Sequence, residues 1–237
     1  MWGSFYFVAA PLAVHSPMLR TAELFDAAQL PPELRDLLAT EYPWEILARL
    51  DVFAASVPAQ VLGDVHPTAV LTGNVFVAAG ARVGPYALIE GPAWLGPGAV
   101  VGHGAYLRGN VVLAPRAKVG HAVEVKRSVL LPAAAAPHFN YVGDSVLGSR
   151  VNLGAGVKLA NFRALAGTVK VEGFDTGLRK FGAALGDDVS LGCNAVTAPG
   201  TVIGPRTVAY HGATLRGLVP ADTVLKLRQE HELTPRR

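Results

Sequence analysis

Two basic residues, Arg108 and Lys126, stand 18 positions apart, and each directly follows an aliphatic residue. If the fold stacks positions 18 apart, the two charges repel unless an anion lies between them, and a phosphate group would suit both. The alternative is a solvated ladder of charges, because Glu90 stands another 18 positions earlier and could neutralise Arg108. The spacing alone leaves both interpretations open.

His138 lies in the segment PHFNYVGD and is a candidate general base. Histidine ionises near neutral pH, so an imidazole beside a phosphate clamp could take a proton from an attacking amine. The alternative is an ordinary surface histidine, which is the commoner case for a residue in a loop. Tyr141, three residues later, could have a purely structural role, in which its ring fills the core and its hydroxyl lies at the edge.

Three other features could indicate chemistry, and we interpret each as structural. His103 and His121 are 18 positions apart, but we find no third histidine at a suitable spacing, so we predict no metal site. Cys193 has no histidine near it in the sequence, which favours a small corner residue over a nucleophile. The glycine-rich stretch 80–104 lacks the GxxxxGK[ST] pattern and is not a P-loop.

A six-residue repeat supplies the geometry that these residues need. Neither the helical period of 3.6 residues nor the strand period of two explains a strict six, whereas a strand that turns a corner every six residues does. Three sides make an 18-residue coil, so we predict a β-solenoid with coils about 4.8 Å apart. The predicted inward positions are all aliphatic: Val65, Leu71, Val77, Val83, Ile89, Leu95, Val101, Leu107, Leu113, Val119, Val125 and Leu131.

The repeat breaks twice within the solenoid predicted over 63–217. After Leu131 the next residue in phase is Tyr141, so 132–140 is predicted to be an excursion from the solenoid. A second excursion is predicted over 160–184, and the phase resumes at Leu185. The in-phase sides amount to about seven coils. Insertions of this kind are where solenoids usually build binding sites.

The two ends of the chain differ from the repeat. Residues 1–62 are predicted to form a short, mainly helical segment, with helices opening near Pro31-Pro32 and Pro43. Residues 218–237 are predicted to form a capping helix with a basic tail, because the last coil of a solenoid needs cover.

Composition and charge narrow the functional class. The net charge is +3, but residues 1–62 carry −4 and residues 63–237 carry +7, which indicates an anionic ligand on the solenoid. Basic residues interleaved with aromatic ones are absent, which argues against nucleic acid. No apolar stretch reaches the roughly 18 residues of a membrane span, and we find no signal peptide. We therefore expect a cytoplasmic protein that binds no membrane, and the single cysteine excludes a disulfide framework.

Two runs of sequence carry a resemblance to a known family. APHFNYVGDSVLGSRVNLGAGVKLANFR and DTGLRKFGAALGDDVSLG resemble the acetyltransferase domain of bifunctional N-acetylglucosamine-1-phosphate uridyltransferase/glucosamine-1-phosphate acetyltransferases. They resemble the archaeal-type sugar-1-phosphate nucleotidylyltransferase/amino-sugar acetyltransferases more closely still. The resemblance covers about residues 63–230. It implies the all-β, left-handed parallel β-helix of the hexapeptide-repeat superfamily.

The resemblance also implies roles for individual residues. His138 would be the general base, and Arg108 and Lys126 would hold the sugar phosphate. The residues implied to orient the sugar are Tyr141, Asn152 and Asn161, and Lys180 would also approach the substrate. The residues implied to line the acetyl-CoA site are Ala155, Cys193, His211 and Arg228. Cys193 stands where the family has a serine, and His211 stands where it has an alanine.

Two functions from different classes follow from these observations. The first is acetyl-CoA-dependent N-acetylation of glucosamine-1-phosphate or a related amino-sugar phosphate by a homotrimer, without a metal. Because the glycine-rich opening of the family's nucleotidyltransferase domain is not in the sequence, we expect no uridyl transfer. The second is a non-catalytic structural or regulatory β-helix that partners a separate sugar nucleotidyltransferase.

Overall fold

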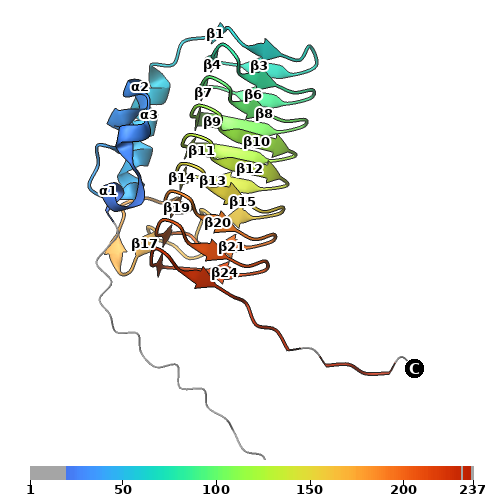
Figure 1. Cartoon of the computed structure of the whole chain (residues 1–237). Coiled ribbons are helices and arrows are strands. Elements are labelled where there is room, and N and C mark those ends of the chain that lie inside the picture. The colour runs from blue at the N-terminus through green and yellow to red at the C-terminus, as the bar shows by residue number, and fades with distance from the viewer. Residues whose placement is uncertain (1–19, 231, 236–237) are drawn as a thin grey trace, which may run out of the picture.

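The computed structural model describes residues 20–230 and 232–235, and these form a parallel β-solenoid with a helical segment along one side (Figure 1). The predicted all-β, left-handed parallel β-helix is confirmed. Nine levels are stacked, more than the sequence pattern predicts, because residues 132–140 and both flanking segments contribute strands. No helix among the described residues is long and apolar enough to cross a membrane.

The solenoid has three faces, and the chain visits them in a fixed order. The first face is a nine-stranded sheet made of β2 (Asp64–Val65), β5 (Arg82–Val83), β8 (Val100–Val101), β10 (Lys118–His121), β12 (Ala135–His138), β15 (Asn152–Leu153), β20 (Ser190–Leu191), β23 (Val208–Ala209) and β26 (Val224–Leu225). Its neighbouring strands are parallel, for example with Lys118 opposite both Val100 and Ala135. Stacked strands of this kind satisfy one another's backbone groups from coil to coil.

The other two faces belong to one fifteen-stranded sheet that bends round a corner. The second face contains β3 (Val70–Thr72), β6 (Leu88–Glu90), the first half of β9 (Tyr106–Leu113), the first half of β11 (Glu124–Leu130), β13 (Tyr141–Gly143), β16 (Lys158–Leu159), β21 (Val196–Thr197) and β24 (Thr214–Leu215). The third face contains β1 (Gln60–Val61), β4 (Val75–Val77), β7 (Ala93–Leu95), the second halves of β9 and β11, β14 (Val146–Leu147), β19 (Ala183–Leu185), β22 (Thr201–Ile203) and β25 (Leu218–Val219).

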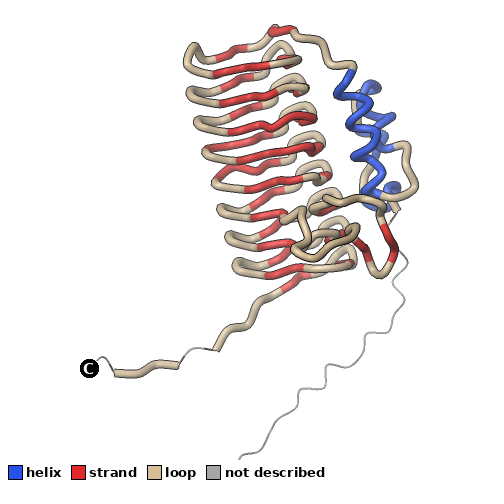
Figure 2. The backbone as a smooth tube through the Cα atoms, turned by 180° about the vertical axis from the view of Figure 1, so that it is seen from behind, coloured by secondary structure: helices blue, strands red, loops and turns tan. Residues whose placement is uncertain are grey.

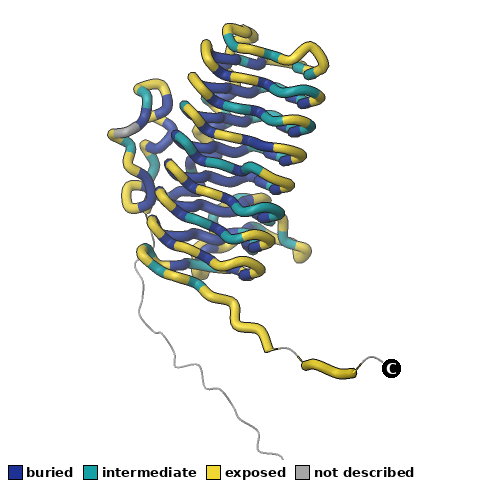
Figure 3. The backbone as a smooth tube through the Cα atoms, turned by 45° about the vertical axis from the view of Figure 1, so that its right-hand side comes forward, coloured by how far each residue is buried: buried dark blue, intermediate teal, exposed yellow. Residues whose placement is uncertain are grey.

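The core lies inside the prism, as Figure 3 shows by burial. Eleven of the twelve predicted inward aliphatics, from Val65 to Val125, are in it or packed against it. The exception is Leu131, because the coil that starts at Leu113 is one residue shorter and brings Leu130 inward instead. Leu131 is buried on the outside of the third face.

The predicted helical segment is confirmed over residues 20–55, and residues 1–19 lie outside the described part of the chain. It consists of α1 (Thr21–Leu24), η1 (Ala27–Gln29), α2 (Pro32–Arg35), η2 (Asp36–Leu38), η3 (Pro43–Glu45) and α3 (Ile46–Ala55). Helix α3 lies along the third face (Figure 2). Its Leu47 and Leu50 share a buried cluster with Val112 and Val129 of that face. The third face is therefore apolar on both sides.

Two segments differ from the prediction. Residues 132–140 do not leave the solenoid: they contain β12, which pairs with β10 and β15. The sequence pattern breaks there because the two coils that meet at β12 are each one residue shorter than the repeat, which places Lys118 opposite Ala135 and Ala135 opposite Asn152. The capping helix predicted over 218–237 is also wrong for the described residues, where 218–225 form β25 and β26 instead. Val219 and Leu225 pack against the core and extend it by most of another coil.

The second predicted excursion leaves the solenoid between β16 and β19. It contains an antiparallel hairpin of β17 (Lys170–Val171) and β18 (Phe174–Asp175). The ring of Phe174 lies 5.5 Å from that of Trp44, and the ring of Phe181 lies 6.3 Å from it. The excursion therefore packs against the helical segment, beside the lower coils.

Candidate active site

Four predicted site residues lie at successive levels of one edge of the solenoid, where the first face meets the second. We call this edge the histidine corner. Backbone hydrogen bonds define it: the N–H of Gly156 donates to His138 O at 2.9 Å, and the N–H of Asn194 donates to Ala155 O at 2.8 Å. The residues stacked there are His103, His121, His138, Ala155, Cys193 and His211. Neighbouring levels are about 4.8 Å apart.

Residues with positive φ turn the chain at this corner. Phe139 has a φ of 52° and Asn194 a φ of 56°. The glycine before the corner is equally important: a Cβ on Gly120 would lie 1.8 Å from the carbonyl oxygen of Pro137. Glycine at position 120 therefore permits the close approach that brings His138 opposite His121.

His138 is exposed at the end of β12, and the structure fixes its backbone. Its N–H donates to Asn140 Oδ1 at 3.0 Å, while Asn140 Nδ2 donates to Gly154 O at 2.7 Å. Asn140 itself is buried. The imidazole is thus presented to solvent from a rigid support, which is the arrangement a general base requires.

The sequence analysis found no third histidine in register with His103 and His121, but His138 is in register with them. His138 is the register partner of His121, because this coil is one residue shorter than the repeat used to align the sequence. His103 and His121 hydrogen-bond to each other, with their Nδ1 atoms 2.9 Å apart. Among the described residues, however, no three His, Cys, Asp or Glu side chains are grouped so that they could hold a metal ion.

The second face carries Arg108 and Lys126, which lie opposite each other on β9 and β11 as their spacing predicts. Each has its own carboxylate. Arg108 Nη1 lies 2.6 Å from Glu124 Oε1, and this hydrogen bond raises the pKa of Arg108. Glu90 does not form the ion pair with Arg108 that its spacing suggested. Instead, its carboxylate accepts a hydrogen bond from the hydroxyl of Tyr106 at 2.7 Å. The predicted phosphate clamp is therefore a pair of cations, each partly neutralised by a neighbouring carboxylate.

Tyr141 points outward, contrary to the predicted inward phase, and Val142 takes the core position. A Cβ on Gly143 would lie 2.7 Å from Tyr141 Oη and 2.6 Å from Asn161 Nδ2, so glycine leaves room for these two groups to meet. Burial raises the pKa of Tyr141, and the nearby charges of Glu124 and Asp144 raise it further. The phenol is therefore held in its neutral, hydrogen-bonding form.

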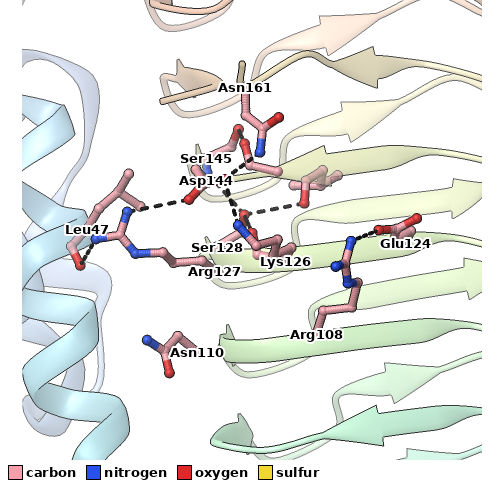
Figure 4. A network of polar contacts seen from close by, with 12 residues as sticks. Leu47, Arg108, Asn110, Glu124, Lys126, Arg127, Ser128, Asp144, Ser145 and Asn161 are labelled. Atoms are coloured by element: carbon pink, nitrogen blue, oxygen red, sulfur yellow. Dashed lines mark hydrogen bonds and ion pairs between the residues drawn. The ribbon is translucent and has the colours of Figure 1, made fainter. Parts of the chain in front are cut away.

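A buried carboxylate, Asp144, joins the predicted substrate residues (Figure 4). It accepts a hydrogen bond from Asn161 Nδ2, and its oxygens lie 3.4 Å from Lys126 Nζ and 3.4 Å from Arg127 Nη1. Arg127 also pairs with Asp51 of α3, with Nη2 2.5 Å from Oδ2. Sequence reasoning missed Asp144, although it lies within the quoted motif HFNYVGD; nothing in the sequence points to Asp51.

The remaining candidates lie on three different elements. Lys180 is bridged to Phe162, the residue after Asn161, and its Nζ lies 5.9 Å from the centre of the Phe162 ring. Asn152 is exposed on the first face, three residues before Ala155. Arg228 is exposed and follows β26 by three residues. The chain leaves the solenoid in an extended segment there (Figure 1). The structure therefore brings Lys180 near Asn161 but does not join Arg228 to the histidine corner.

The site as a whole spans one edge and one face. His138 lies at the histidine corner, and Tyr141, three residues further, begins the adjoining second face. A ligand with an anionic group on Arg108 and Lys126 would place its uncharged part toward Tyr141 and the histidine corner. This arrangement suits a phosphorylated substrate that reacts at a second group, with a base available at that end.

Comparison with known proteins identifies similar sequences over most of the solenoid. Residues 89–174 match the family model of the GMPPB C-terminal domain. The chain is 39% identical to a bifunctional GlmU protein of Methanococcus maripaludis over 199 residues, which are 83% of this chain and 48% of that protein. It is also 39% identical over 90 residues to a bifunctional sugar-1-phosphate nucleotidylyltransferase/acetyltransferase of Sulfurisphaera tokodaii, covering 36% of this chain and 22% of that protein.

Among solved structures, the chain matches PerB from Caulobacter crescentus, determined in complex with CoA and GDP-perosamine. The sequence identity is 17%, the TM-score is 0.22, and the match covers 76% of this chain and 59% of PerB. The chain spans at most about half the length of the curated relatives reported above. Its homologues are the GlmU bifunctional proteins and the archaeal-type bifunctional sugar-1-phosphate nucleotidylyltransferase/acetyltransferases.

Proposed function

We propose that this chain is an acetyl-CoA-dependent N-acetyltransferase whose acceptor is the amine of glucosamine-1-phosphate or a closely related amino-sugar phosphate. The observation that carries the proposal is the position of His138, exposed on a rigid support beside the face that carries Arg108, Lys126 and Tyr141. The similarity to a bifunctional GlmU protein over 83% of the chain, and to a bifunctional sugar-1-phosphate nucleotidylyltransferase/acetyltransferase over 36% of it, supports the same reaction class.

In this proposal the sugar phosphate binds across the second face. Arg108 and Lys126 contact the phosphate oxygens, and Tyr141 and Asn161 donate hydrogen bonds to the sugar. Lys180 approaches from the excursion, and Asn152 from the first face. These contacts would hold the sugar amine near the histidine corner, where the reacting atoms meet.

Acetyl-CoA would bind along the lower histidine corner. Ala155, Cys193 and His211 are stacked there, small enough at the first two levels for a thioester to lie against the backbone. Arg228 would contact a CoA phosphate from the C-terminal segment. The N–H of Gly156 is already bonded to His138 O, so the N–H of Ala155 is the candidate donor to the oxyanion.

The reaction needs no acyl-enzyme. The neutral amine attacks the thioester carbonyl carbon while His138 accepts the amine proton, and collapse of the tetrahedral intermediate breaks the C–S bond. The proton then passes from His138 to the departing CoA thiolate. His138 is therefore expected to affect turnover more than binding.

The test is release of free CoA thiol from acetyl-CoA with a panel of amino-sugar phosphates. We expect His138→Ala to lower kcat by about 10²- to 10⁴-fold, because a positioned general base contributes that much. His66→Ala is the matched control, since His66 is an exposed turn histidine in the first coil whose imidazole hydrogen-bonds to the neighbouring Thr68. Activity that is unchanged in His138→Ala would overturn the assignment.

Two further parts of the proposal concern assembly. We infer that the solenoid forms a homotrimer with sites between subunits, which sedimentation equilibrium would test by mass. The competing function is a structural subunit that partners a separate nucleotidyltransferase. Calorimetry that detects binding of neither CoA nor sugar phosphate would favour that function over catalysis.

A further inference from the structure

We propose that Asp144 is a positioning residue that holds Lys126 and Asn161 in the geometry needed for the acceptor, and that helix α3 supports it through Asp51 and Arg127. The inference rests on the proposed function, because Lys126 and Asn161 matter only if they bind the acceptor. It assigns a role to the helical segment, which otherwise only covers the third face.

Asp144 is unusual in both its burial and its partners. Its side chain is 2% exposed, yet its donors come from separate elements. Lys126 comes from β11 one coil earlier, and Asn161 comes from the start of the excursion. Figure 4 shows these side chains converging on the carboxylate. A buried carboxylate in this place is costly unless its donors are retained, so its contacts should be rigid.

The backbone of Asp144 is fixed as firmly as its side chain. Asp144 has a φ of 45°, at the corner between the second and third faces. Its N–H donates to Lys126 O at 2.9 Å, and its carbonyl oxygen accepts from the N–H of Gly182 at 2.9 Å. It is therefore held between the coil that precedes it and the point where the excursion returns.

Lys126 needs such a support more than Arg108 does. A lysine side chain is a flexible chain of four methylenes with a compact charge, and its position is set by what the ammonium contacts. The Lys126 side chain is 25% exposed, and Asp144 is its ion-pair partner. Without that partner, the ammonium would sample several rotamers before it met a phosphate.

The third donor, Arg127, is bound mainly from the helix. Asp51 of α3 lies 2.5 Å from Arg127 Nη2 and 3.0 Å from Arg127 Nε, closer than the 3.4 Å between Arg127 Nη1 and Asp144. Asn110 Nδ2 also donates to Asp51, at 2.7 Å. Because Asp51 supplies most of the charge that Arg127 needs, Asp144 can serve Lys126 and Asn161. The position of α3 is thereby coupled to the second face.

Positioning and simple neutralisation predict opposite results for Asp144→Asn. If Asp144 only neutralised Lys126, its loss would free a positive charge and strengthen binding of a phosphate. If Asp144 positions Lys126 and Asn161, the amide turns a donor toward Lys126 and weakens binding of the acceptor. The direction of the change therefore decides between the two roles.

The experiment uses the full chain, with glucosamine-1-phosphate and acetyl-CoA as probes. For Asp144→Asn we expect the KM for glucosamine-1-phosphate to rise about tenfold, with the KM for acetyl-CoA unchanged. Asp51→Asn, which touches no predicted substrate residue, should raise the same KM by about twofold to threefold, because its effect reaches Asp144 through Arg127. Calorimetric titration with glucosamine-1-phosphate alone should show the same order of affinities.

The matched control is Asp222→Asn. Asp222 forms a two-contact ion pair with Arg206, at 2.6 Å each, on a different corner of the solenoid. Its loss should leave both KM values unchanged, which separates site positioning from general loss of an ion pair. If Asp144→Asn does not fold, Asp51→Asn carries the test.

An acceptor KM that is unchanged or lowered in folded Asp144→Asn overturns the inference and leaves the proposed function intact. So does an equal rise in the KM for acetyl-CoA, or, where Asp144→Asn does not fold, an unchanged acceptor KM in Asp51→Asn. A wild-type chain that neither binds nor acetylates glucosamine-1-phosphate overturns the proposed function, and this inference with it.

Discussion

At the scale of single residues, the candidate site depends on pairings between charged and polar groups. The spacing of Arg108 and Lys126 predicted their adjacency, and the register confirms it. Their carboxylate partners, Glu124 and Asp144, were not predictable, because they depend on which rotamers reach across neighbouring coils. Ion pairs formed across strands leave no periodic trace in a sequence, whereas stacked positions do.

Tyr141 gives a prediction at this scale. Its pKa is raised by burial and by the charges of Glu124 and Asp144, so the phenol stays protonated up to and beyond its ordinary value near 10. Tyr141→Phe should raise the KM for the amino-sugar phosphate by about threefold to tenfold, through loss of one hydrogen bond. Steady-state kinetics with acetyl-CoA at saturation would measure this.

The pH profile provides the control for Tyr141. Because the raised pKa keeps Tyr141 neutral below pH 9, wild type and Tyr141→Phe should show log(kcat/KM) curves of the same shape between pH 6 and about 9. A limb that is present in wild type and lost in the variant would contradict the neutral role of the phenol.

At the scale of elements, the helical segment and the excursion were both visible in the sequence, but their contact was not. Prolines near the helix starts and the break in the six-residue phase located them. The packing of Trp44 against Phe174 and Phe181 became visible only in the structure. Contacts between segments more than 100 residues apart arise from packing of apolar surfaces, which local patterns do not encode.

The packing of α3 on the third face should contribute to the stability of the fold. Leu47 is fully buried between α3 and the solenoid, so Leu47→Ala should lower the free energy of unfolding by about 2–5 kcal/mol. Urea unfolding followed by tryptophan fluorescence suits this test, since Trp44 and Trp94 are both buried in the same interface.

Val52→Ala is the matched control on the same helix. Val52 is 75% exposed, and its truncation should change the free energy of unfolding by no more than about 0.5 kcal/mol. Equal effects of the two substitutions would mean that α3 does not depend on its apolar face for attachment.

At the scale of the whole molecule, the number of residues in each coil decides which residues of neighbouring coils are stacked on each other. Coils of the regular length stack Arg108 on Lys126, and coils that are one residue shorter stack His121 on His138. The same change turns Leu131 and Tyr141 outward. Because each coil stacks on the one before it, a coil that is one residue shorter changes which residues are in register in every later coil.

The close approach of Gly120 to Pro137 can be tested by a substitution. Gly120→Ala should cost about 3 kcal/mol of stability and lower acetyl transfer, because the new Cβ would meet the Pro137 carbonyl at 1.8 Å and displace the strand that ends at His138. Thermal unfolding and thiol release would measure the two effects.

Gly84→Ala is the control at the equivalent position of an earlier coil. There the nearest atom would lie 3.2 Å from the new Cβ, so a smaller loss of stability and no loss of activity are expected. If both variants behaved alike, the close approach at Gly120 would not be what places His138.

The sequence by itself determined the solenoid, because burial of one aliphatic residue per side repeats at a fixed interval and is written directly into the chain. It also identified the residue types of the candidate site through motifs such as HFNYVGD. Only the tertiary structure decided where the coils shorten, that the chain continues into β25 and β26 where a helix was predicted, and that Asp144 joins Lys126 to Asn161. Those outcomes depend on how closely neighbouring coils approach at single glycines and on contacts between segments that are distant in the sequence. Neither can be read from a single stretch of sequence.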